Sequence, residues 1–198
     1  SAEPEESRPR LHASGGPPRH RRPRGCRVLR RRRRRRHSPT VTTAVTAVAG
    51  VATGSLGGRA AGRGQPRQPR PGAADLLATA RRVGVPCALV SMSFTSVLRQ
   101  VVDTLPEGSF AVIIGGDQVT CGKPDPEPYL SAASALGVAP LDCLVLEDSI
   151  PGTLSAQNAG MPTLGIPFEQ DIQPGPRRIL IPTLEGLTWE SVTKLWRE

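Results

Sequence analysis

From residue 71 onward, short apolar runs alternate with longer segments in which apolar residues recur every three or four positions. The runs contain almost no polar residues, which is typical of strands buried on both faces of a parallel sheet. The predicted strands are 86–90, 111–114, 144–146, 162–166 and, at a sheet edge, 179–181.

The segments between these runs predict helices. Residues 73–83 place Leu76, Leu77 and Ala80 on one face, and Gly84 follows as a helix stop. The other predicted helices are 95–104, 126–136, 152–159 and 189–196. Strands alternating with helices predict an α/β fold, a doubly wound Rossmann-like parallel sheet with helices on both faces.

Composition divides the chain into two parts. Of its 26 basic residues, 18 are arginines within the first 70 residues, which hold three acids and little apolar periodicity. A segment of this kind buries too little apolar surface to offset the entropy lost on ordering, so disorder is predicted. We assign residues 1–69 to a low-complexity segment and 70–198 to a folded, mildly acidic core domain.

Two interpretations of the low-complexity segment stay open. The run from Arg30 to Arg36 would bind nucleic acid through its phosphates. Alternatively, Arg, Pro, Gly and Ala tracts arise when a GC-rich gene is translated out of frame. The absence of Lys, Asp, Phe, Tyr and Trp from the first 70 residues favours the second interpretation.

Several classes of protein are disfavoured. All three histidines lie within the first 37 residues, which argues against Ser-His-Asp chemistry and His-based metal sites in the core domain. The four cysteines form no CxxC pair, and Cys87 and Cys143 lie in apolar runs, as expected of reduced, buried thiols in a cytoplasmic protein. No apolar run reaches the length of a membrane span.

Polar residues follow the carboxyl ends of three predicted strands. They are Ser91 after 86–90, Lys123 in the loop after 111–114, and Glu147 with Asp148 after 144–146. Taken singly, they could be a helix cap, a solvated lysine and ordinary loop acids. Ligands of doubly wound sheets bind at this edge, however, so we expect the four residues to converge.

Phosphoryl transfer requires such a set of groups. The Ser91 hydroxyl, the Met92 N–H at a strand-to-helix turn and the Lys123 ammonium suit phosphate oxygens. One or two carboxylates suffice for Mg²⁺, which prefers oxygen ligands, and Asp148 with Glu147 fits that task.

The segments GGDQVTCGKPDPEPY and LVLEDSIPGTLSAQNAGM resemble the third and fourth motifs of the haloacid dehalogenase superfamily, in its β-phosphoglucomutase and phosphatase branch. The resemblance implies a Mg²⁺-dependent hydrolase, a phosphatase or phosphomutase, acting on a small phosphorylated metabolite. It implies that Ser91 binds phosphate and that Lys123 neutralises the phosphate and the nucleophile. It also implies that Asp148 binds Mg²⁺ with Glu147 as a second ligand or orienting acid, and that Ser149 caps the following helix.

The family's first motif, DxDxT, supplies an aspartate nucleophile on a central strand, ahead of a helical cap. This chain contains no Asp-x-Asp, and its first aspartate is Asp75. We therefore expect the central nucleophile strand to be missing or replaced, and this truncated or frame-shifted chain to be inactive.

The alternative is a non-catalytic pseudo-enzyme whose Arg-rich tail binds nucleic acid or another polyanion. A serine hydrolase using Ser91 or Ser93 with Lys123 is a third hypothesis. Substrate identity and oligomeric state stay open.

Overall fold

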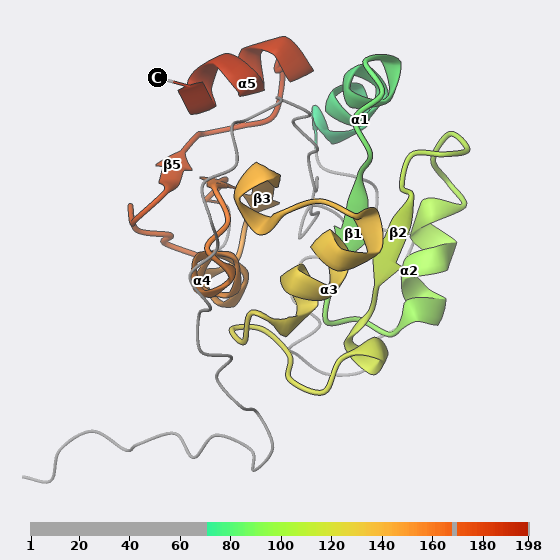
Figure 1. The fold of residues 1–198 in the computed structure, drawn as a ribbon. Coiled ribbons are helices and arrows are strands. Elements are labelled where there is room, and N and C mark those ends of the chain that lie inside the picture. Colours follow the sequence, from blue (N-terminus) through green and yellow to red (C-terminus); the bar gives the residue numbers. More distant parts are fainter. Residues whose placement is uncertain (1–70, 168–169, 198) are drawn as a thin grey trace, which may run out of the picture. The chain divides into compact units, whose positions relative to one another are not determined.

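Parallel strands and helices alternate through residues 71–167 and 170–197, which are the residues that the computed structural model describes (Figure 1). The predictions for residues 1–69, namely disorder and nucleic-acid binding by the arginine run, concern residues outside these ranges. The described residues all belong to one compact unit of the chain.

The strands form two parallel sheets. In the first, β1 (Ala88–Val90) pairs with β2 (Val112–Ile114). In the second, β3 (Val145–Glu147) pairs with β4 (Thr163–Gly165), and β4 pairs with β5 (Arg178–Leu180). Within the described ranges no strand connects β1 to β3. The parallel arrangement predicted from the apolar runs is confirmed, and the predicted loss of the central strand stays a prediction for the remainder of the chain.

Helices follow the strands as the periodicity predicts. They are α1 (Ala73–Arg82), α2 (Thr95–Val102), α3 (Glu127–Leu136), α4 (Ile150–Ala159) and α5 (Trp189–Arg197), with short 3₁₀ helices η1 (Gly116–Gln118) and η2 (Pro140–Asp142). Helices α3 and α4 end at Gly137 and Gly160, whose φ angles of 71° and 76° are left-handed. Glycine adopts this conformation without the steric cost of a side chain, which explains both helix ends.

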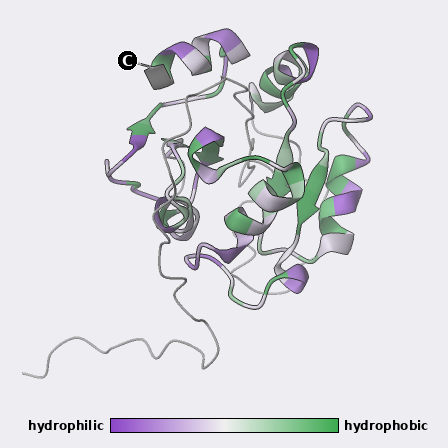
Figure 2. Cartoon of the chain, viewed as in Figure 1, coloured by the Kyte–Doolittle hydropathy of each residue, from purple (hydrophilic) through white to green (hydrophobic). Residues whose placement is uncertain are grey.

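Two apolar clusters cover opposite faces of the strands. Cys143 and Val145 belong to a cluster that includes residues of α3 and α4. Leu144 and Leu146 belong to a second cluster, which includes residues of α1 and α5. Successive strand side chains point to opposite faces, so both faces of β3 are covered by helices, as a doubly wound fold requires. Strands β1 and β2 are accordingly hydrophobic in Figure 2.

The start of α4 differs from the prediction by two residues. The helix begins at Ile150 instead of 152 because Ser149 is its N-cap, and the Ser149 hydroxyl accepts a hydrogen bond from Gly152 N at 3.1 Å. Proline is tolerated in the first helical turn, so Pro151 does not delay the helix. The predicted capping role of Ser149 fits this geometry.

Replacing Ser149 with alanine is expected to lower the free energy of unfolding by about 1–2 kcal/mol, because the cap is lost. Urea denaturation would measure the change. Thr193→Ala is the matched control, since the Thr193 hydroxyl donates to Glu190 O within α5 and caps no helix end. Equal stability of the Ser149→Ala and Thr193→Ala proteins would contradict the assignment of the cap.

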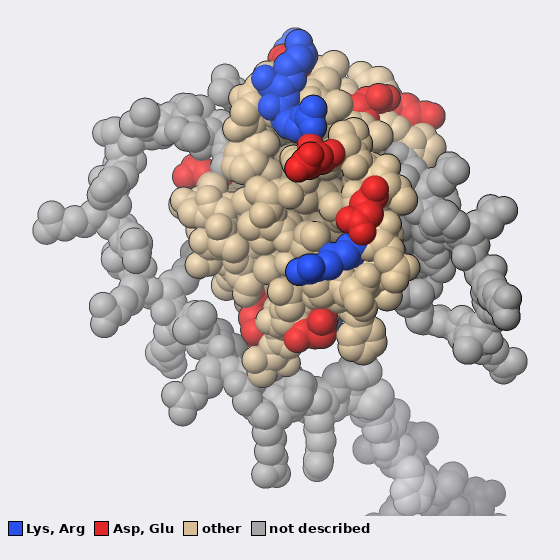
Figure 3. Space-filling view, turned by 90° about the vertical axis from the view of Figure 1, so that its right-hand side faces the viewer, with Lys and Arg blue, Asp and Glu red and all other residues tan. Residues whose placement is uncertain are grey.

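Acidic and basic side chains both lie on the face of the molecule that Figure 3 shows. On the face in Figure 3, acidic and basic side chains are scattered among uncharged ones and form no single basic patch. Among the helices of residues 71–167 and 170–197, none is both long and apolar enough to cross a membrane.

Candidate functional site

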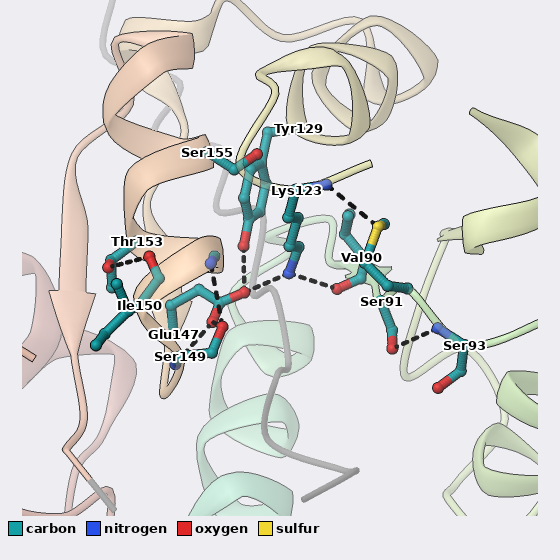
Figure 4. Close-up of polar contacts among 12 residues, drawn as sticks. Val90, Ser91, Ser93, Lys123, Tyr129, Glu147, Ser149, Ile150, Thr153 and Ser155 are labelled. Carbon is teal, nitrogen blue, oxygen red and sulfur yellow. Dashed lines mark hydrogen bonds and ion pairs between the residues drawn. The ribbon is translucent and has the colours of Figure 1, made fainter. Parts of the chain in front are cut away.

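The predicted site residues come from the carboxyl ends of β1 and β3 and from one loop. Ser91 directly follows β1, and Glu147 is the last residue of β3, with Asp148 after it. Lys123 lies between η1 and α3 and reaches both strand ends (Figure 4). The structure therefore brings the lysine into direct contact with the ends of two strands that are 57 residues apart in the sequence (Val90 and Glu147).

Lys123 is buried at this junction. Its side chain is 7% exposed, and its Nζ forms a short ion pair with Glu147 Oε1 and donates to Val90 O at 3.2 Å. The ammonium group also lies 4.8 Å from the centre of the Tyr129 ring, a distance at which the ring face attracts a cation. These contacts hold the charge beside Ser91, the residue that follows Val90.

The loop that carries Lys123 is attached to α4. Ser155 Oγ donates to Asp125 O at 2.5 Å, and Asn158 Nδ2 donates to Pro124 O at 2.9 Å. Both donors project from the same helix, one turn apart. The position of Lys123 therefore depends on α4 as well as on the two strands.

Glu147 has no exposed surface, and each of its carboxylate oxygens has protein partners. Oε1 accepts from Lys123 Nζ and, at 2.6 Å, from the Tyr129 hydroxyl. Oε2 accepts from Ser149 N at 3.1 Å and from Ser149 Oγ at 2.9 Å. Burial by itself raises the pKa of Glu147, but the charge of Lys123 and these hydrogen bonds outweigh it and hold the pKa below its ordinary value. The carboxylate is thus ionised, and both of its oxygens accept hydrogen bonds from protein groups.

Gly152 packs directly against this carboxylate. A Cβ atom at this position would lie 2.0 Å from both Cδ and Oε1 of Glu147, far inside van der Waals contact. The close approach of α4 to the end of β3 therefore requires glycine at position 152.

Ser91 and Met92 form the turn after β1. Ser91 is buried, and its Oγ accepts a hydrogen bond from Ser93 N at 3.2 Å. The Met92 side chain is exposed, and its Sδ accepts from Lys123 N at 3.3 Å, which links this turn to the lysine loop. Lys123 Nζ donates to Val90 and Glu147 and to neither serine hydroxyl, so the serine-hydrolase hypothesis gains no support.

Asp148 is half-buried and follows directly after the strand residue Glu147. It lies at the end of β3, the strand end that Lys123 also contacts, and its carboxylate offers hard oxygen ligands. Because one or two carboxylates are sufficient for Mg²⁺, the residues present fit this ion through Asp148. Both Glu147 oxygens already accept hydrogen bonds from protein groups, which favours Glu147 as an orienting acid over Glu147 as a second Mg²⁺ ligand.

A second group of side chains lies in the loop before α3 and at its first residue, where Cys121, Asp125 and Glu127 place ligand atoms close together. Cys121 is disulfide-bonded, so its sulfur is not a thiolate ligand. Both Glu127 oxygens already accept backbone N–H groups, from Thr120 and Cys121 at 2.8 Å each. Asp125 Oδ1 accepts from Glu127 N at 3.0 Å. The two carboxylates thus accept backbone hydrogen bonds that stabilise the turn leading into α3, and we assign no metal site there.

Two residues of the site had no role assigned from the sequence. Tyr129 and Gly152 both lie within the segments that resemble the family motifs, but by themselves they suggest an aromatic core residue and a small helical residue. Neither has a local pattern that reveals contact with Glu147. Their importance follows only from the approach of α3 and α4 to the end of β3.

Comparisons with known proteins agree with this geometry. A family model described as haloacid dehalogenase-like hydrolase matches residues 15–160, which is more than half of the chain and extends upstream of residue 71.

Individual relatives match a smaller part. A bifunctional riboflavin kinase/FMN phosphatase of Arabidopsis thaliana is 40% identical over 100 residues, covering 49% of this chain and 26% of the relative. A phosphoglycolate phosphatase of Escherichia coli is 34% identical over 99 residues, covering 50% of this chain and 39% of the relative. The chain thus spans well under half the length of these two relatives.

Among solved structures, CbbY from Rhodobacter sphaeroides in complex with phosphate has a TM-score of 0.57 and 29% sequence identity. The similarity covers 64% of this chain and 59% of that one.

Proposed function

Because the chain belongs to the haloacid dehalogenase-like hydrolase family, we propose that Ser91, Lys123 and Asp148 form the phosphate- and Mg²⁺-binding part of a phosphoryl-transfer site for a small phosphorylated substrate. The membership confirms the resemblance found in the two motifs. The proposal depends above all on one observation, the buried Lys123 ammonium held between Glu147 and Val90 O, beside Ser91.

Phosphate binding would use three kinds of donor. Lys123 supplies a fixed positive charge, the Ser91 hydroxyl a neutral donor, and the Met92 N–H a donor at the start of the turn before α2. A phosphate group spreads its charge over several oxygens, and positioned donors in a partly buried site bind such a group strongly. That the related CbbY structure holds phosphate supports this assignment.

Asp148 would hold Mg²⁺ at the same edge. The bound ion would supply further positive charge to neutralise the phosphate oxygens. We assign Glu147 to the lysine and not to the ion, because Lys123, Tyr129 and Ser149 occupy its two oxygens.

Turnover by this chain is expected to be absent. A family phosphatase needs an aspartate nucleophile, and the 198 residues contain no Asp-x-Asp. The two acids at the site have other roles, since Glu147 pairs with Lys123 and Asp148 is assigned to Mg²⁺. We therefore propose a site that binds phosphate and Mg²⁺ without hydrolysing phosphate esters.

Calorimetric titration of the protein with orthophosphate, in MgCl₂ and in EDTA, tests this function. We expect saturable binding that is tighter in MgCl₂, together with no release of nitrophenol from para-nitrophenyl phosphate. No binding in either buffer would disprove the phosphate site. Mg²⁺-dependent release of nitrophenol would show that the chain has a nucleophile that its motifs do not reveal.

Replacing Asp148 with asparagine is expected to abolish the effect of MgCl₂ on phosphate affinity, because the amide has lost the charge that holds the ion. The same titrations measure it. Asp142→Asn removes an exposed acid in η2 and is the matched control. If Asp148→Asn responds to MgCl₂ as strongly as Asp142→Asn does, the metal assignment is wrong.

A further inference from the structure

We propose that Tyr129 is a positioning residue of the phosphate site. Its hydroxyl fixes the Glu147 carboxylate, and Glu147 in turn directs the Lys123 ammonium toward the end of β1. This inference rests on the proposed function, since it concerns the same lysine.

The contact between Tyr129 and Glu147 is short and fully enclosed. Tyr129 lies in the first turn of α3 and has no exposed surface. Its hydroxyl donates to Glu147 Oε1 at 2.6 Å, the oxygen that also pairs with Lys123 Nζ. Burial, and then the charge of Glu147, raise the pKa of Tyr129 well above its ordinary value, so the hydroxyl keeps its proton and stays a donor.

Four groups leave the carboxylate a single orientation. Tyr129 and Lys123 hold Oε1, Ser149 holds Oε2, and the backbone at Gly152 blocks the side toward α4. Tyr129 is the neutral partner on Oε1, and its fully buried ring in the first turn of α3 fixes the position of the hydroxyl. The hydroxyl therefore defines where Oε1 lies when a phosphate competes for the ammonium.

The lysine needs this restraint because its own side chain is flexible. Four rotatable bonds separate Nζ from the backbone, and a bare ammonium has no preferred direction. Its remaining contacts are the Val90 carbonyl, at 3.2 Å, and the face of the Tyr129 ring, 4.8 Å from the ring centre. A fixed Glu147 Oε1 keeps the charge at the strand ends, whereas a mobile one would let it turn away from Ser91.

Tyr129→Phe isolates the hydroxyl in this arrangement. The variant keeps the aromatic ring, its packing and its attraction for the ammonium, and it removes one hydrogen bond to Glu147. Thr163→Val is the matched control. It removes a buried hydroxyl from β4, which donates to Met161 O at 3.3 Å, and it preserves the shape of the side chain. A merely structural role of Tyr129 predicts that both variants lose stability and keep the same affinity for phosphate.

The experiment is calorimetric titration of the full chain with orthophosphate in MgCl₂, with folding checked by circular dichroism. We expect Tyr129→Phe to bind about fivefold more weakly than wild type, the size expected when one net hydrogen bond no longer restrains the lysine. Thr163→Val should bind as wild type does. Ser149→Ala, which loosens the other carboxylate oxygen, should shift the affinity in the same direction and serves as the second variant if Tyr129→Phe does not fold.

The outcomes separate the two proposals. Equal affinities of Tyr129→Phe and Thr163→Val, in a wild-type protein that binds phosphate, overturn the inference and leave the proposed function standing. The same holds if Ser149→Ala is used and its affinity equals that of Thr163→Val. A wild-type protein that binds no phosphate overturns both.

Discussion

Replacing Lys123 with methionine is expected to lower the free energy of unfolding by about 3–5 kcal/mol and to remove measurable phosphate binding. The loss of stability follows from the partner that remains. Glu147 has no exposed surface, so removing the ammonium leaves a buried carboxylate without a counter-charge. Urea denaturation gives the stability, and titration with orthophosphate gives the binding.

A double variant separates the two effects. Adding Glu147→Gln to Lys123→Met removes the orphaned charge. The amide oxygen can accept from Ser149, while the amide NH₂ faces the Tyr129 hydroxyl oxygen and can donate to it. Because a buried ion pair can be replaced by neutral groups at little cost, most of the lost stability should return. Phosphate binding should not return, since the positive charge is still absent. Recovery of binding in the double variant would show that Lys123 contributes to folding alone.

Replacing Gly152 with alanine is expected to destabilise the protein by about 3 kcal/mol or more, because the new methyl group overlaps the Glu147 carboxylate. Helix propensity alone predicts the opposite sign, a gain of about 1 kcal/mol for Gly→Ala inside a helix. Denaturant unfolding therefore distinguishes the two effects by the sign of the change.

Gly175→Ala is the matched control for this substitution. A Cβ atom at Gly175 would lie 3.3 Å from Gln157 Oε1 and 3.5 Å from the Arg178 guanidinium, the far ends of two flexible side chains. These can move aside at small cost, so a change near zero is expected. If Gly152→Ala is as stable as Gly175→Ala, the carboxylate is free to move, and the positioning role of Tyr129 loses its basis.

The order of strands and helices could be predicted because it depends on local pattern. Apolar runs such as 86–90 are too short and too continuous for surface helices, and glycines such as Gly137 end helices through their own backbone conformation. Several boundaries differ from the prediction by one or two residues, and at the start of α4 a side-chain contact explains the difference. At α4 the hydrogen bond from Gly152 N to the Ser149 hydroxyl moved the start of the helix to Ile150.

The sequence could not distinguish the roles of the two neighbouring acids, Glu147 and Asp148. Glu147 and Asp148 are adjacent and chemically alike, and the sequence places both at the end of a strand. Extending β3 by one residue buries Glu147 among α3, α4 and the lysine loop, while Asp148 stays half-buried at the edge. Glu147 still belongs to β3, whose two faces are both covered by helices, whereas Asp148 lies beyond the end of the strand.

By itself, therefore, the sequence determined the alternating α/β order, the placement of Ser91, Lys123 and Asp148 beyond strand ends, and the family motifs around them. Only the tertiary structure decided that Lys123 pairs with Glu147, that Tyr129 holds the same oxygen, and that Gly152 must lack a side chain. The physical reason is the range of the interactions. Helix and strand patterns arise between near neighbours along the chain, whereas the Lys123 and Tyr129 contacts with Glu147 join residues 24 and 18 positions apart. Their geometry depends on how separate strands and helices pack.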